Sequence, residues 1–199
     1  MLKPTDCNFM FCLPLTKEQF NLDSENLSKH FVREHLPINK PIESKEGKLW
    51  NVYDEEVIQP YLKLKRQFSS YGFSFNESVT FSNFIKLIDN SHVNILFSHC
   101  KTGVDEAIEL FDRLVPKDEF VNAIPLNYNK VLDLSVCKPE FTARELKDKR
   151  RDAIVKSVTK SISFMLWLYF YGLAFEIIYK QKAEYYSNAI DQTISKIYS

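Results

Sequence analysis

Two side chains that can do nucleophilic chemistry follow two short apolar runs, 38 positions apart (137 − 99). His99 follows the run Val93–Phe97, and Cys137 follows the run Val131–Val136. A thiol attacks a carbonyl carbon efficiently only as a thiolate, and a nearby imidazole can accept its proton. If the fold brings them together, His99 and Cys137 form a nucleophile–base pair. Taken singly, each residue has a structural alternative, because a Cys or a His at a strand end is commonly a core residue.

The two runs have the composition of strands that are buried on both faces of a sheet. Between them, apolar and polar residues alternate over 107–115, which predicts a hairpin, and Pro116 opens a predicted helix that ends at Pro125. Two strands joined by a crossover helix are parallel. Open parallel sheets bind ligands at the carboxyl ends of their strands, and we expect His99 and Cys137 to lie side by side there.

One other histidine competes for the role of base. His92 precedes the first run and is therefore expected at the entry end of the strand, a strand length from the carboxyl edge. We discount it for that reason.

The order of these motifs resembles that of the caspase-like clan of cysteine peptidases, and most closely its bacterial CHAT branch. In that clan a strand ends in Ser-His-Gly, a hairpin and a helix follow, and the next strand ends in the nucleophilic Cys. The corresponding segments here are Ser98-His99-Cys100, the predicted hairpin and Leu132-Asp133-Leu134-Ser135-Val136-Cys137. The resemblance is strongest over residues 79–140, and the stretch 167–171 is similar to an aromatic helix that packs behind the sheet in CHAT domains.

The resemblance implies a role for each residue of the pair. Cys137 attacks a peptide carbonyl, and His99 acts first as general base and then as general acid. The oxyanion is bound by the backbone N–H groups of Cys137 and of the residue after the His, which here is Cys100 rather than Gly. Backbone donation does not require Gly, although a Cβ narrows the approach of the substrate. Cys100 is either a second thiol near the site or, as we prefer, a small filler residue.

A second departure from the clan concerns the substrate pocket. Several members that cleave after basic residues carry Asp two positions before the nucleophile, where this chain has Ser135. Strand alternation places Asp133, Ser135 and Cys137 on one face, with Asp133 one step deeper. Two roles remain open for Asp133, the wall of an acidic pocket or a buried structural carboxylate. The sequence therefore selects no preferred substrate side chain.

Composition and charge narrow the classes of protein. Of the 199 residues, 45% are hydrophobic and 26% are charged, with zero formal net charge, as in ordinary globular proteins. Because there is no basic surplus to meet phosphates, we expect no nucleic-acid partner. The cysteines lack the C-x₂-C spacing of zinc sites, so we expect reduced thiols, no metal and no cofactor. The start of the chain lacks the apolar core of a signal peptide, which favours a cytoplasmic location.

The remaining segments predict further strands and helices. Expected strands are 7–15, 71–75 and 153–155, and expected helices are 24–36, 54–69 with an interruption at Pro60, 78–88, 161–175 and 183–198. His30 and His35 are five apart, not the four that place two metal ligands on one helix face, so we expect surface residues. We interpret the hydrophilic segment 138–152 as an exposed charged loop or helix end. In caspase-like peptidases, the segment after the nucleophile is often a mobile active-site loop.

The stretch 161–175 is uncharged and raises the question of a membrane span. It ends at Glu176 after 15 residues, whereas a spanning helix needs about 20 apolar residues. We therefore expect a helix that is buried in the domain, and no membrane partner.

Together these observations predict one caspase-like α/β domain over residues 1–199, with a mostly parallel central sheet and helices on both faces. The expected function is a cysteine endopeptidase acting on a protein or peptide substrate. The resemblance implies regulated proteolysis in bacteria, including antiviral defence, with an activating or regulatory protein partner. Three alternatives remain: a catalytically silent caspase-fold subunit that binds or regulates, a different α/β enzyme in which Cys137 is structural, and a membrane-associated protein anchored by residues 161–179.

Overall fold

A five-stranded sheet forms the centre of the computed structural model, which describes residues 1–22, 46–160, 162–181 and 183–198. The strand order is β2-β1-β3-β7-β8, and every neighbouring pair is parallel. The strands are β1 Cys7–Phe11, β2 Ser74–Glu77, β3 Val93–Phe97, β7 Val131–Ser135 and β8 Ile154–Ser157. The predicted parallel α/β sheet is confirmed, although β2 begins later than the strand predicted at 71–75.

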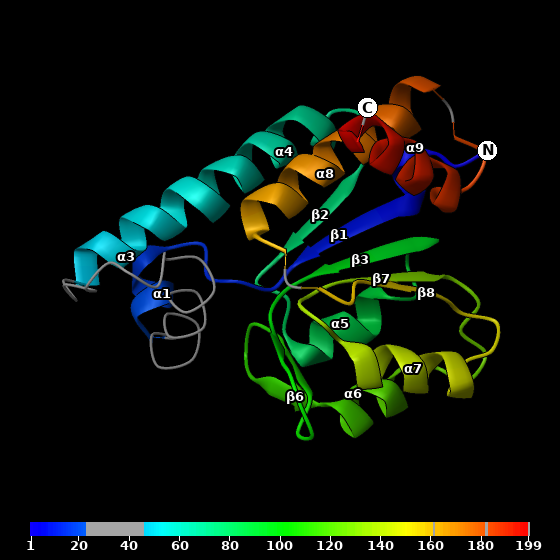
Figure 1. The fold of residues 1–199 in the computed structure, drawn as a ribbon, viewed down its shortest axis with the longest axis horizontal. Helices are drawn as coiled ribbons and strands as arrows, with labels where there is room; N and C mark the ends of the chain where they lie inside the picture. The colour runs from blue at the N-terminus through cyan, green and yellow to red at the C-terminus, as the bar shows by residue number, and fades with distance from the viewer. Residues whose placement is uncertain (23–45, 161, 182, 199) are drawn as a thin grey trace.

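Helices cover both faces of the sheet (Figure 1). One face carries α4 (Gln59–Ser69), α8 (Phe164–Glu176) and α9 (Tyr186–Tyr198). The other carries α5 (Phe81–Leu87), α6 (Lys117–Ala123) and α7 (Glu140–Lys149). The shorter elements are α1 Lys17–Leu22, α3 Glu46–Tyr53 and the single turns η1 Pro4–Asp6, η2 Asp54–Ile58 and η3 Ile177–Gln181. The prediction of helices on both faces is therefore confirmed.

Strand alternation divides the apolar side chains into two cores. On the α8 face, the ring of Phe11 lies 4.0 Å from that of Tyr61 and 5.4 Å from that of Phe97, measured between centroids. On the opposite face, Met10 and Leu96 pack in a largely aliphatic cluster. The high content of aromatic residues, 16 Phe and 10 Tyr, is thus concentrated on the face that α8 covers.

The helix predicted over 54–69 changes its hydrogen-bond pattern before Pro60. Proline lacks an N–H, and its ring collides with the carbonyl group four residues earlier in a regular helix. Here the π-helical turn η2 ends at Ile58, and Pro60 stands in the first turn of α4, where no intrahelical donor is needed. The predicted interruption at Pro60 is confirmed as a π turn within a helical run from α3 to α4.

The late apolar stretch forms α8, as predicted, and the last helix is α9. Trp167 and Tyr171 of α8 stack at 5.7 Å between ring centroids and face the sheet. Within the described ranges, no helix has both the length and the apolar character needed to cross a bilayer. The helix predicted from residue 24, with His30 and His35, lies outside the described residues.

Most of the segment after Cys137, for which an exposed charged loop or helix end was predicted, is the helix α7. Arg150, which follows α7, is buried rather than exposed, at 4% exposure. Its guanidinium donates to the carbonyl oxygens of Ile124 at 2.7 Å and Val121 at 3.0 Å. Val121 lies in the last turn of α6 and Ile124 directly follows the helix, so Arg150 supplies a donor to carbonyl groups at the helix end. The sequence did not indicate this contact, because the contact joins residues that are far apart in the chain.

We expect Arg150→Met to lower the free energy of unfolding by about 3 kcal/mol, because two buried carbonyl groups lose a charged donor. The matched control is Arg151→Met, at the exposed neighbouring position, with a change below about 0.5 kcal/mol. Urea denaturation followed by circular dichroism measures both. Equal losses in the two variants would contradict the role of Arg150.

Candidate functional site

The two predicted reactive residues follow neighbouring strands at the same edge of the sheet. β3 and β7 pair in parallel, with Phe97 opposite Ser135. The ladder continues past both strand ends, because the Ser98 N–H donates to the Ser135 carbonyl at 3.3 Å. His99 and Cys137 each stand two residues beyond the last register pair. Neighbouring strands are spaced by about 4.8 Å, so the segments that carry His99 and Cys137 leave adjacent strands at the same edge of the sheet.

Both side chains face the segment that leads into α8. The His99 ring meets the edge of Phe164, the first residue of α8, at 4.7 Å between centroids. The Sγ of Cys137 lies 4.0 Å from the carbonyl oxygen of Ile162. Only 4% of His99 and 3% of Cys137 are exposed. The fold thus brings the predicted pair to one place, in a site that is closed to solvent.

A small antiparallel sheet holds the chain after His99. Its strands are β4 Cys100–Lys101, β5 Ala107–Glu109 and β6 Leu114–Pro116, which confirms the predicted hairpin. The Glu109 N–H donates to the His99 carbonyl at 3.0 Å, and the Ser98 hydroxyl donates to the Glu109 carbonyl. These bonds fix the backbone on both sides of the imidazole.

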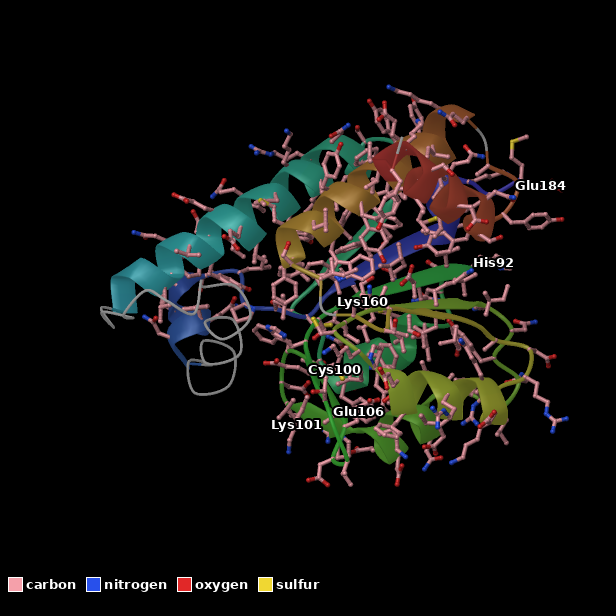
Figure 2. All side chains as sticks on the ribbon, viewed as in Figure 1. His92, Cys100, Lys101, Glu106, Lys160 and Glu184 are labelled. Atoms are coloured by element: carbon pink, nitrogen blue, oxygen red, sulfur yellow. The ribbon has the colours of Figure 1, made fainter. Side chains whose placement is uncertain are left out.

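Cys100 lies on β4, and its thiol packs in the core cluster that contains Met10 and Leu96. Hydrogen-bonded and non-hydrogen-bonded pairs alternate along an antiparallel ladder. His99 and Glu109 form a hydrogen-bonded pair, because the Glu109 N–H donates to the His99 carbonyl. The next pair, Cys100 with Ile108, is therefore a non-hydrogen-bonded pair, in which the backbone N–H and C=O groups point away from the partner strand. The Cys100 N–H therefore points out of the hairpin. Figure 2 shows Cys100 near Lys101 and Glu106, and His92 at the opposite end of β3.

Glu106 is a residue of the site that the sequence did not reveal. It is 3% exposed, and its carboxylate accepts hydrogen bonds from the backbone N–H groups of Thr142 at 2.6 Å and Phe141 at 3.2 Å. Both N–H groups lie in the first turn of α7, where a carboxylate is favoured by the helix dipole. Glu106 thereby ties the hairpin after His99 to the turn after Cys137. Its partners are 35 and 36 residues away, so no local sequence signal could have indicated them.

We expect Glu106→Ala to lower the free energy of unfolding by about 2 kcal/mol, because the N-terminus of α7 loses its cap. Glu106→Gln should cost less, since the amide oxygen can still accept one bond. Asp105→Ala at the exposed neighbouring position is the control and should be close to neutral. Thermal and urea unfolding measure the three variants. A loss for Asp105→Ala as large as that for Glu106→Ala would contradict the capping role.

The two residues predicted to line a substrate pocket belong to a buried hydroxyl network on β7. Tyr186 donates to Asp133 Oδ2 at 2.6 Å, and Ser135 Oγ donates to Asp133 Oδ1 at 3.4 Å. The Ser135 hydroxyl also bonds the hydroxyl of Tyr171. Ser135 is fully buried, whereas Asp133 contributes to the wall of a cavity of about 380 Å³ between β8, α8 and α9.

Burial raises the pKa of Asp133 above its ordinary value, and the hydrogen bonds from Tyr186, Tyr171 and Ser135 oppose that rise. Burial also raises the pKa of both tyrosine hydroxyls, so they remain protonated donors. The network is thus built around one carboxyl group with three hydroxyl neighbours. Burial likewise raises the pKa of the Cys7 and Cys12 thiols, which disfavours either of them as a nucleophile.

The raised pKa of Asp133 predicts a pH-dependent stability. Between the ordinary value of 3.8 and the raised pKa, the folded protein keeps a proton that the unfolded chain releases. The free energy of unfolding therefore decreases as pH rises through this window, by at most about 1.4 kcal/mol per pH unit. Asp133→Asn removes this titration and keeps an acceptor for Tyr186.

We therefore expect the stability of wild type relative to Asp133→Asn to fall as the pH rises above the ordinary value of 3.8 and through the raised pKa of Asp133. Urea denaturation at each pH measures the difference, with Asp152→Asn at an exposed position as the control. A difference that stays constant or increases with pH would contradict the raised pKa.

No disulfide joins the four cysteines, each of which the structure describes as buried. Across the described part of the chain, no three His, Cys, Asp or Glu side chains are grouped as a metal site requires. Comparison of the chain with protein-family models, curated proteins and solved structures found no match. The caspase-like resemblance therefore remains an expectation from the sequence.

Proposed function

We propose that this protein is a cysteine endopeptidase in which Cys137 is the nucleophile and His99 is the general base and acid. The observation that supports the proposal is the parallel pairing of β3 with β7, because His99 and Cys137 follow the ends of these two strands at one edge of the sheet. The antiparallel hairpin and α6 between the two strands are the elements that the caspase-like resemblance implies.

The reaction follows from the chemistry of these groups. His99 takes the proton of the Cys137 thiol, and the thiolate attacks the carbonyl carbon of a peptide bond. The negative charge on the carbonyl oxygen is stabilised by the N–H groups of Cys137 and Cys100. His99 then returns the proton to the departing amine, and a thioester remains. Water, deprotonated by His99, attacks the thioester and releases the acid, which restores the thiol.

The burial of both side chains bears on how the activity is controlled. A peptide reaches Cys137 only after Ile162 and Phe164 have moved from the positions in which they contact the pair. Such a closed site suits an enzyme that a protein partner activates. This agrees with the regulated proteolysis, including bacterial antiviral defence, that the resemblance implies.

The same burial favours one rival, a catalytically silent caspase-fold protein that acts as a binding or regulatory subunit. Cys100 in the position of the usual Gly also favours it. The two proposals predict different reactivities for the Cys137 thiol. The peptidase requires a reactive thiol, and the silent subunit does not.

We expect a library of peptidyl electrophiles to label the native protein at Cys137, and Cys137→Ala to abolish labelling. His99→Ala should slow labelling by about 100-fold or more, because it removes the general base. Cys100→Ala keeps both members of the pair and should label almost as fast as wild type. Intact-protein and peptide mass spectrometry locate and time the modification.

Circular dichroism must show that all three variants keep the wild-type fold. Labelling that is absent, or that moves to Cys100 or Cys7, would contradict the peptidase proposal for the isolated chain. Labelling of His99→Ala at the wild-type rate would show a reactive thiol that does not depend on the pair.

A further inference from the structure

A cavity lies beside the proposed nucleophile, on the same face of the sheet. Its volume of about 380 Å³ falls within the range of ligand pockets. Most of its wall is aliphatic or aromatic, and the apolar residues that shape it include Val158, Ile162, Leu166, Phe170, Ile190 and Ile194. Such a wall offers an apolar group a surface away from water.

One residue links the cavity to the Cys137 thiol. Ile162 lines it, and the carbonyl oxygen of the same residue lies 4.0 Å from Cys137 Sγ. Asp133 of β7 also lines it and stands four residues before Cys137 in the chain. A peptide held at Cys137 can therefore place a neighbouring side chain in this cavity once Ile162 makes way.

The polar groups of the cavity do not suit a cationic side chain. Asp133 already accepts hydrogen bonds from Tyr186 and Ser135, and burial favours its neutral form. Lys156 is its register partner on β8 and also lines the cavity. An entering Arg or Lys would meet the ammonium group of Lys156 and a carboxyl group whose bonds are already taken. Opposed like charges of this kind reject a ligand.

One aromatic residue of the wall can report on an occupant. Trp167 lines the cavity and is 6% exposed. Its fluorescence is therefore expected to change when a ligand enters.

We propose that this cavity is the specificity pocket of the peptidase, that it takes a large apolar side chain such as Leu, Met or Phe, and that Lys156 excludes Arg and Lys. The inference rests on the proposed function, and it decides between the two roles that the sequence left open for Asp133. Asp133 is a structural carboxyl group in the wall of the pocket, not a partner for a basic substrate.

Peptidyl chloromethyl ketones test the preference on the full chain, because the thiolate displaces chloride and the rate reports the fit of the adjacent side chain. We expect reagents with Leu or Phe next to the ketone to alkylate Cys137 faster than those with Arg or Lys, by about tenfold or more. Equal rates, or faster alkylation by the basic reagents, would overturn the inference while leaving the proposed function intact.

A charge reversal tests whether Lys156 excludes basic substrate side chains. Lys156→Glu should shift the ratio of the two rates towards the basic reagents by about tenfold or more, and Lys156→Gln should shift it less. Lys63→Glu, a charge reversal on the exposed surface of α4, is the matched control and should leave the ratio unchanged. An unchanged ratio in both Lys156 variants would show that Lys156 does not select the substrate.

Binding to a variant that cannot react tests the pocket independently of the peptidase activity. In Cys137→Ala, titration with N-acetyl-leucinamide should change the fluorescence of Trp167 saturably, and N-acetyl-lysinamide should not. The same titration in Cys137→Ala with Trp167→Phe measures the signal of Trp50, which is subtracted. If no reagent alkylates wild type but the leucine amide binds, the proposed function fails for the isolated chain, and the cavity is still shown to bind an apolar side chain. If the leucine amide does not bind, the pocket proposal fails.

Discussion

The parallel pairing of β3 with β7 is the constraint on which the candidate site depends. Parallel strands need a crossover connection, and the hairpin and α6 provide it between the two residues proposed to react. The pairing makes His99 and Cys137 follow adjacent strand ends, whereas a shift of register by one residue would move the side chains of one strand to the opposite face. The apolar residues of both strands are buried on both faces, so such a shift would also disrupt the two cores.

Polar contacts between distant segments hold the surroundings of this pairing in place. Glu106 links the hairpin to the start of α7, and Arg150 links the end of α7 to the end of α6. On the other face, Asp133 is held by hydroxyl groups from α8 and α9. Each of these ionisable side chains is buried, and each is bound by backbone or hydroxyl groups that compensate for the loss of water. Removal of one partner is therefore expected to cost more than a surface ion pair does.

The closed form of the site connects its structure with its proposed regulation. Ile162, two residues before α8, has its carbonyl oxygen 4.0 Å from the Cys137 Sγ. Ile162 also contributes to the wall of the adjacent cavity. The proposed opening of the site and the proposed entry of a side chain into the pocket therefore involve the same residue.

Local pattern in the sequence determined the elements and their order. Apolar runs indicated the strands before His99 and Cys137, and alternation indicated the hairpin between them, because side-chain spacing follows backbone geometry. Only the tertiary structure decided the strand order, the helical state of residues 140–149, and the roles of Glu106, Arg150 and Asp133. Those features depend on contacts between residues far apart in the chain, and burial there, rather than residue type, decides whether a charged group is solvated or bound.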